Sequence, residues 1–237
     1  ECERFLRTNR RPLVRGVVGL HASFTVSDET IREAATLARD LGSVLHVHVA
    51  EDMADVEDAR TRGYPGPLAR LRDLGALPPG SVLAHGVHLS PEQVREAEQL
   101  GCWLVHNPRS NEGNRVGYAG NLQFASKIAL GTDGWNADMA EEEAALVRLA
   151  KDHGDNRAAG RLAGGHALIA ERFRAVSELA PGALGDAVVW ENEKVRHSIV
   201  GGRVAVEDGR LIGGNIDVIS RAARDSALGL WERMAAI

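Results

Sequence analysis

The sequence predicts an α/β protein with a parallel sheet over its first two-thirds and a small antiparallel β subdomain near its end. Short, nearly uninterrupted apolar segments alternate with helical patterns, as in a sheet that is buried on both faces. Each of these apolar segments ends in a polar residue. After about residue 181, short strands separated by glycine-containing turns replace this pattern, which is typical of hairpins.

Helical signals separate the apolar segments. Ser27 is expected to cap a helix whose apolar stripe runs to Leu41, and Ser90 with Gln93 forms a capping box with proline at the first helical position. A short helix is expected near 68–74 and a longer one over 138–151. The segments between them are expected to be five parallel strands: 17–20, 44–49, 82–84, 103–105 and 128–130.

The C-terminal region predicts hairpins and a closing helix. Gly201-Gly202 and Asp208-Gly209 are turn dipeptides between short β-branched runs. The helix is expected over about 218–234. The expected division is 1–180 for the sheet-containing domain, 181–215 for the β subdomain and 216–237 for the C-terminal helix.

Composition excludes several classes of protein. The chain has 237 residues, a formal net charge of −5, 44% apolar and 26% charged residues, close to the average of globular domains. Two cysteines cannot form a disulfide scaffold or a cysteine-rich zinc site. No apolar run reaches the roughly 20 residues that span a bilayer. Mild acidity with dispersed arginine argues against nucleic acid as a partner, and a cytoplasmic enzyme is expected.

The five predicted strands each end in a residue suited to metal binding or hydrogen bonding. The carboxyl ends of parallel strands are where the active sites of α/β sheets and barrels assemble. Because histidine is an uncommon residue, five such ends in succession are not expected by chance. The strand ends carry His21, His48, His85, His106 with Asn107, and Asp133.

Two of these residues and a neighbour predict a metal centre. His48 and Glu51 form a His-x-x-Glu pattern, and Asp133 follows Gly131-Thr132 at an exposed strand tip. Imidazole with carboxylate suits Zn²⁺ or Fe²⁺ better than Mn²⁺ and leaves an open position. A metal there would lower the pKa of a bound water toward about 7.

A single histidine at a strand end is more often structural than a ligand, so only the combination supports this hypothesis. His46 shares a strand face with His48 and is expected to pack in the layer behind the site. The other histidines outside the pattern are expected to be structural: His88, His153, His166 and His197.

These residues, in this order, resemble the amidohydrolase superfamily. The resemblance is to its aminohydrolase branch, which contains guanine-type deaminases and the ATZ/TRZ-type chlorohydrolases and deaminases, and it is nearest to the SsnA type. It covers nearly the whole chain. The segments that carry it are 19–25, 46–51, 84–89, 106–111 and 131–134, together with 114–117 and Asp138-Met139.

The resemblance implies a hydrolytic deaminase with one divalent metal, zinc by preference and iron as the second candidate. His48 and Asp133 would be metal ligands, and Asp133 would also take a proton from the metal-bound water. Glu51 would carry a proton to a ring nitrogen of the substrate. His85 would orient the attacking hydroxide and polarise the scissile carbon.

The resemblance also implies the substrate class and its contacts. The substrate would be a small nitrogen heterocycle, with a purine or pterin as the best candidate, and ammonia would be released. His21 would contact it, and Asn107 and Asn111 would shape the pocket. Members of this family are often homodimers.

One feature of the family pattern is absent. Its first barrel strand ends in a His-x-His pair that binds the metal, but no histidine precedes His21. The only such pair, His46-x-His48, leads to Ala50-Glu51, which belongs to the fifth strand of the family barrel. A complete (β/α)₈ barrel of the TIM type needs eight units and roughly 250 residues. We therefore expect an incomplete barrel of about five units with part of a β subdomain.

Three interpretations follow. The chain is expected to be the C-terminal part of a longer enzyme, in line with its start at Glu1-Cys2 without methionine or signal peptide. Alternatively, another chain completes the barrel, or the chain is a truncated product without activity. In the last case it would be a pseudo-enzyme that serves as a binding or scaffold module. A chlorohydrolase or amidase on the same scaffold is a further alternative.

Overall fold

The computed structural model describes residues 1–176, 178–192 and 194–236. The chain divides into two compact units, Glu1–Arg174 and Ala175–Ile237. The first contains the parallel sheet, and the second contains the antiparallel sheet and the C-terminal helix.

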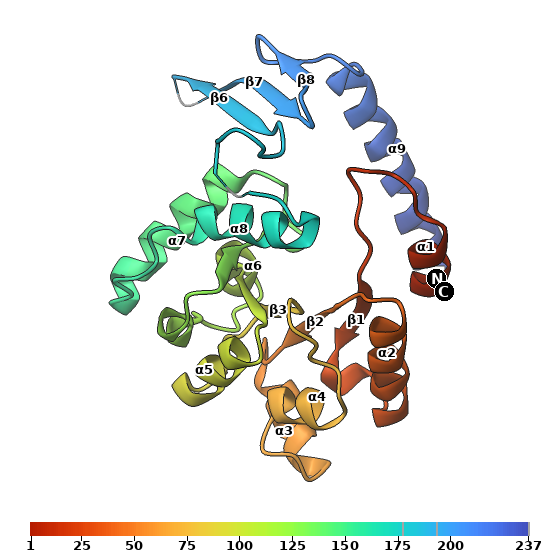
Figure 1. Cartoon of the computed structure of the whole chain (residues 1–237), viewed down its shortest axis with the longest axis vertical. Coiled ribbons are helices and arrows are strands. Elements are labelled where there is room, and N and C mark those ends of the chain that lie inside the picture. The colour runs from red at the N-terminus through yellow and green to blue at the C-terminus, as the bar shows by residue number, and fades with distance from the viewer. Residues whose placement is uncertain (177, 193, 237) are drawn as a thin grey trace. The chain divides into compact units, whose positions relative to one another are not determined.

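The first unit is built on a five-stranded parallel sheet in which each strand pairs with the next along the chain (Figure 1). This confirms the predicted succession of β/α units. Its strands are β1 (Val18–Ala22), β2 (Leu45–Val49), β3 (Val82–His85), β4 (Trp103–His106) and β5 (Ile128–Leu130). Its helices are α1 (Cys2–Thr8), α2 (Asp28–Asp40), α3 (Met53–Thr61), α4 (Pro67–Asp73), α5 (Pro91–Gln99), α6 (Pro108–Gly113), α7 (Met139–His153) and α8 (Arg161–Phe173), with the 3₁₀ turns η1 (Ser23–Thr25) and η2 (Gly120–Phe124).

Local sequence signals place several helix starts where they were expected. The Ser27 hydroxyl accepts a hydrogen bond from the Thr30 N–H at the start of α2. Ser90 and Gln93 form the predicted capping box of α5. Asp138 caps α7 by accepting from two backbone N–H groups. These side chains satisfy donors that a helix leaves unpaired at its first turn.

Four of the described helices, α1, α3, α6 and α8, were not predicted from the sequence. α8 contains Gly164 and Gly165, which disfavour an isolated helix. The structure gives the reason for one of these glycines, because a Cβ at Gly164 would overlap the carbonyl oxygen of Ile128. α8 thus approaches β5 so closely that only glycine fits at the contact. Tertiary packing, rather than local propensity, selects this helix.

The core lies between the sheet and the helices that cover it. Alternation along β2 buries Leu45, Val47 and Val49, which join the same apolar cluster as Ile31 of α2. His46 and His48 point to the opposite face of that strand. His46 was expected to pack behind the site, but it is exposed, because its face of β2 is not the one that the core covers.

A buried arginine ties the segment after β1 to the helices that follow. Arg70 of α4 is fully buried and donates hydrogen bonds to the carbonyl oxygens of Ser23 (2.5 Å) and Val26 (2.9 Å). It also forms ion pairs with Asp28 (2.7 Å) and Asp58 (3.4 Å). One guanidinium therefore satisfies groups from η1, α2 and α3 together.

A second buried network follows β4. The Arg161 guanidinium donates to His106 Nδ1 at 2.9 Å and pairs with Asp155 at 2.7 Å. The Tyr118 hydroxyl donates to the same Asp155 carboxylate at 2.7 Å. Burial, reinforced by the nearby Arg161 charge, lowers the pKa of His106 to about 3. His106 is therefore a neutral hydrogen-bond acceptor at physiological pH.

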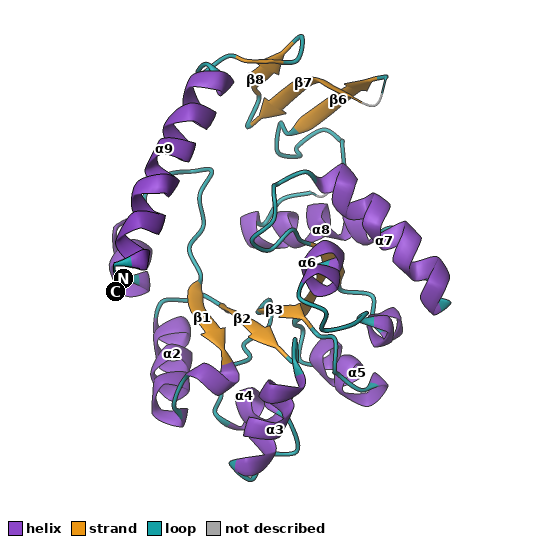
Figure 2. Ribbon diagram, turned by 180° about the vertical axis from the view of Figure 1, so that it is seen from behind, coloured by secondary structure: helices purple, strands orange, loops and turns teal. Residues whose placement is uncertain are grey.

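The second unit is an antiparallel sheet followed by a long helix (Figure 2). Gly201 and Gly202 join β7 to β8 with positive φ angles of 56° and 76°, and Asp208 and Gly209 join β8 to β9 with 46° and 73°. Positive φ at both central residues is the geometry of the tight hairpins predicted here. The elements are β6 (Ala187–Glu191), β7 (Lys194–Val200), β8 (Arg203–Glu207), β9 (Arg210–Leu211) and α9 (Ile216–Ala235).

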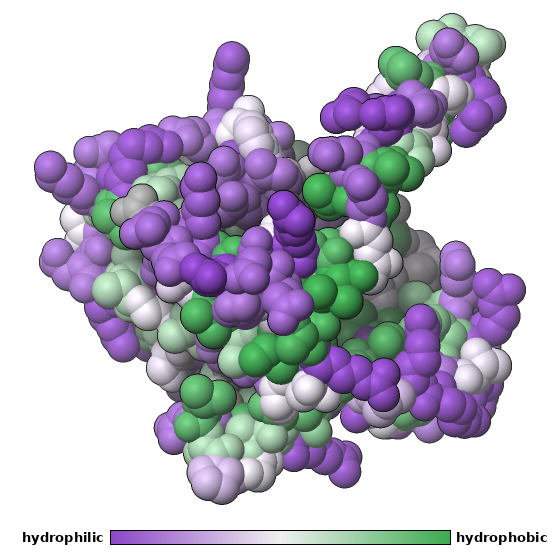
Figure 3. All heavy atoms as spheres, turned by 90° about the horizontal axis from the view of Figure 1, so that it is seen from above, coloured by the Kyte–Doolittle hydropathy of each residue, from purple (hydrophilic) through white to green (hydrophobic). Residues whose placement is uncertain are grey.

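On the face of the molecule shown in Figure 3, most residues are hydrophilic, and apolar residues lie among them. Several of the exposed apolar side chains belong to α9, including Trp231 and Met234. Among the described residues, no helix has the length and apolar character needed to cross a membrane.

Replacing the buried Arg70 is expected to destabilise the first unit strongly. Arg70→Leu leaves two carbonyl oxygens without this donor and removes one partner from each of two carboxylates, and breaking a buried ion pair costs about 3–5 kcal/mol. The control Arg62→Leu removes an exposed pair with Asp58 and is expected to cost less than about 1 kcal/mol. Equilibrium unfolding in urea measures both. Equal losses in the two variants would contradict the role assigned to Arg70.

The buried His106 is expected to make stability depend on pH. Its folded pKa is about 3 and its ordinary value is 6.5, so the unfolded chain takes up a proton between these values that the folded chain does not. Stability therefore falls as the pH drops below about 6.5, by about 2 kcal/mol between pH 7 and pH 5. The variant His106→Gln, which keeps an acceptor for Arg161, should lose this part of the dependence. Identical pH profiles of wild type and variant would argue against it.

Candidate metal centre at the carboxyl ends of the strands

The predicted site residues of the first three strands gather at one edge of the sheet. His21 lies in β1, His48 in β2 and His85 at the end of β3. The ring centroids of His21 and His48 are 5.1 Å apart, and those of His48 and His85 are also 5.1 Å apart. Parallel pairing brings these residues together, because it places the carboxyl ends of neighbouring strands side by side.

Three side chains form a group that can hold a metal ion. One donor atom from each of His48, His85 and Asp133 lies within 4.8 Å of the other two. Two imidazoles and a carboxylate are a donor set that suits zinc, so these residues fit the predicted metal. Burial lowers the pKa of His48, and the neighbouring His85 lowers it further. The neutral imidazole that results is the form that binds metals.

The backbone at these strand ends is unusual. Ala50, His85 and Asp133 have φ angles of 52°, 72° and 51°, in the left-handed region that residues other than glycine rarely adopt. Such conformations are costly and persist where the surrounding structure imposes them, often at functional sites. Here they turn the chain sharply at the ends of β2, β3 and β5, where the candidate ligands lie.

His85 is held in one tautomer by the helix that follows β4. Its Nδ1 is 2.8 Å from Asn111 Oδ1 in α6, and because this oxygen can only accept, Nδ1 is assigned as the donor. The Nε2 atom is then unprotonated and able to bind a metal. It lies 3.5 Å from Glu51 Oε2. The imidazole itself is almost fully buried.

The same helix and the residue that follows it, Asn114, hold the two carboxylates. The Ser110 hydroxyl donates to Asp133 Oδ2 at 2.5 Å, and Asn114 Nδ2 donates to Glu51 Oε1 at 3.2 Å. Neither Ser110 nor Asn114 was predicted as a site residue. The signal was present in the spacing of 107, 110, 111 and 114, which places four short polar side chains on one face of a helix.

Asn107 and Asn111 lie behind His85 and are nearly fully buried. With its amide oriented by its partners, Asn107 donates to the carbonyl oxygens of Gly131 (3.0 Å) and His106 (3.3 Å), which ties the end of β4 to the residue after β5. A Cβ at Gly131 would lie 2.6 Å from the Asn107 amide, so glycine is required there. Both asparagines contact the His85 ring rather than open space.

His21 lies on the open side of the group. Its ring is exposed and meets the His48 ring edge-on, and its Nδ1 is 3.2 Å from Thr25 Oγ1. The structure therefore brings His21, His48, Glu51, His85 and Asp133 together at one edge of the sheet. His106, at the end of β4, is buried instead in the network with Arg161.

Solved structures of known proteins share this architecture. An adenosine deaminase from Xanthomonas campestris with bound zinc superposes with a TM-score of 0.82 at 22% identity, covering 98% of this chain and 60% of that one. The atrazine chlorohydrolase TrzN from Arthrobacter aurescens TC1, complexed with zinc, superposes with a TM-score of 0.71 at 19% identity, covering 96% and 58%. These similarities confirm the fold, a partial barrel.

Sequence comparison agrees with the fold. The 5-methylthioadenosine/S-adenosylhomocysteine deaminase of Syntrophobacter fumaroxidans is 28% identical over 254 aligned positions, covering 92% of this chain and 58% of that protein. The chain thus spans less than two thirds of the length of these relatives. The sequence model of the amidohydrolase family matches residues 1–205. The resemblance found in the sequence is confirmed, and the chain belongs to the amidohydrolase family.

Proposed function

We propose that this chain carries the proton-transfer groups and part of the metal site of a hydrolytic deaminase for a purine-like heterocycle. One observation carries the proposal. Helix α6 and its flanking residues bond one atom each of Glu51, His85 and Asp133, and the second polar atom of each is left to act in the shared space. Three groups held in this way are oriented before any substrate binds, which is what proton transfer at a fixed atom requires.

The ligands that this chain would supply to the metal are His48 and Asp133, and His85 lies beside them. Zinc is the first candidate, because the donors suit it and because the two solved structures compared above contain it. Iron remains the second candidate. When bound, a divalent metal lowers the pKa of a coordinated water toward about 7 and polarises the group under attack.

The two carboxylates have different environments that suit different roles. Asp133 Oδ2 accepts the Ser110 hydrogen bond, so Oδ1 is the oxygen that takes a proton from the attacking water. Glu51 accepts from Asn114 through Oε1, so Oε2 is the oxygen that delivers a proton to a ring nitrogen. His85 Nε2, 3.5 Å from that oxygen, is placed to orient the water and polarise the carbon. A base and an acid on separate supports are the usual requirement for this chemistry.

The substrate is proposed to be an amino-substituted purine or its nucleoside, with ammonia as the second product. The relative from Syntrophobacter fumaroxidans is named for two adenosine derivatives, and the Xanthomonas campestris structure is an adenosine deaminase. We propose that exposed His21 contacts the heterocycle and that Asn107 and Asn111 shape the pocket through the His85 ring. Homodimer formation and a cytoplasmic location stay predictions from the sequence.

Metal content is expected to depend on the strand-end donors. Protein expressed from its complete gene and purified without chelator, as a monodisperse sample, should contain about one zinc per chain by elemental analysis. His48→Ala and Asp133→Ala should each lose most of it, because each removes one donor of the group. The control His197→Ala lies in the second unit and should retain it. Zinc retained equally in all three variants would place the metal elsewhere.

Ammonia release is expected from adenosine-type nucleosides. The protein, expressed from its complete gene and loaded with zinc, should deaminate them, and Asp133→Asn should reduce kcat by about 10²-fold or more, since the base is lost. Glu51→Gln should reduce it similarly, and Arg196→Gln should not. Chloride release from a chlorotriazine without ammonia release would indicate a chlorohydrolase. A zinc-loaded protein inactive in both assays would favour the non-catalytic module.

A further inference from the structure

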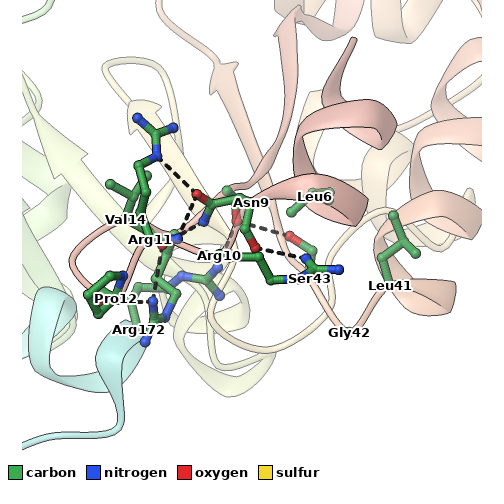
Figure 4. Close-up of a pocket in the computed structure, with 12 residues that line it drawn as sticks. Leu6, Asn9, Arg10, Arg11, Pro12, Val14, Leu41, Gly42, Ser43 and Arg172 are labelled. Atoms are coloured by element: carbon green, nitrogen blue, oxygen red, sulfur yellow. Dashed lines mark hydrogen bonds between the residues drawn. The ribbon is translucent and has the colours of Figure 1, made fainter.

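Four arginines surround a cavity of about 370 Å³ in the first unit (Figure 4). Three of them, Arg10, Arg11 and Arg15, lie in the loop before β1, and the fourth, Arg172, comes from the end of α8. The turn between α2 and β2 completes the wall. A cavity of this size falls in the range of small-molecule sites.

The cavity lies at the opposite edge of the sheet from the candidate metal centre. Gly16 precedes the start of β1 at Val18, and Ser43 precedes the start of β2 at Leu45. Both therefore line the amino ends of the strands, whereas His21 and His48 lie toward the carboxyl ends. Because β1 and β2 are parallel, these two ends are on opposite edges. The cavity is thus separate from the proposed deaminase site.

The local charge is strongly positive in a chain that is acidic overall. Residues 4–27 contain five arginines and no aspartate or glutamate, although the formal net charge of the chain is −5. Within the described residues, no carboxylate forms an ion pair with any of the four arginines of the cavity. Burial and the neighbouring Arg15 charge lower the pKa of Arg172. Positive charges that gather without acidic partners attract anions.

The guanidinium groups are held in place by the chain itself. Arg15 packs over the Phe173 ring at 4.5 Å, and Arg172 Nη2 donates to the Gly16 carbonyl oxygen at 3.1 Å. Arg11 donates to the Asn9 side chain at 3.1 Å. Arg10 donates through Nη1 to the carbonyl oxygens of Arg7, in α1, and Asn9. Arg15 donates through Nη1 to those of Pro12 and Val14 in the loop. The other N–H groups of these rigid forks are left for a ligand.

We propose that this cavity binds a small anion through a phosphate group. Several guanidinium forks match the geometry and multiple charge of phosphate better than those of a single carboxylate. The cavity exceeds the size of one phosphate, so the phosphate can be free or can belong to a nucleotide. The site is independent of the proposed function, because the heterocycle would bind at the other edge of the sheet.

Thermal shift and calorimetric titration test the proposal at low ionic strength with orthophosphate, pyrophosphate, AMP and adenosine. The phosphates should raise the Tm of wild type and adenosine should not, since a ligand that binds the folded state stabilises it. The double variant Arg10→Gln/Arg11→Gln should bind about tenfold or more weakly. Arg172→Gln should weaken binding independently.

The control Arg148→Gln/Arg196→Gln removes the same charge at exposed arginines elsewhere and should bind as wild type. AMP binding more tightly than orthophosphate would identify a nucleotide site, and equal affinity would identify a site for free phosphate. Each variant is first checked for a wild-type Tm without ligand. The proposal is overturned if no phosphate compound binds wild type, or if the cavity variants bind as the control does.

Discussion

Parallel pairing of β1 to β5 is the constraint on which the candidate site depends. The pairing brings residues that are far apart in sequence, from His21 to Asp133, to one edge of the sheet. The same pairing separates this edge from the arginine-lined cavity, which lies at the amino ends of β1 and β2. The two sets of polar groups therefore lie at opposite edges of the sheet, and neither charge set neutralises the other.

Helix α6 orients the side chains that the sheet brings close together. A histidine and two carboxylates at strand ends could adopt many rotamers, but one short helix and the residue after it bond an atom of each. The left-handed backbone at His85 and Asp133 adds to this, because it turns both residues in a way that an extended strand could not. Orientation of this kind lowers the entropy that must be lost when the reacting groups meet.

The buried arginines and the arginines of the cavity have different kinds of partner. Arg70 and Arg161 are buried and have both carboxylate and carbonyl or imidazole partners, as expected when desolvation must be compensated. The arginines at the cavity have only carbonyl, amide or aromatic partners among the described residues. Arg70 and Arg161 thus face carboxylates within the fold, whereas no carboxylate of the described residues pairs with the arginines of the cavity.

The sequence by itself determined the strand succession, the caps of α2 and α5, the hairpin turns and the family, because these depend on local patterns and motifs. It also indicated His48, Glu51, His85 and Asp133 through their positions after apolar strands. Only the tertiary structure decided that Ser110 and Asn114 support the carboxylates and that α8 forms around Gly164. It also decided that Arg172 shares one cavity with the arginines of the loop before β1. These depend on contacts between distant segments, which local propensity and spacing do not encode.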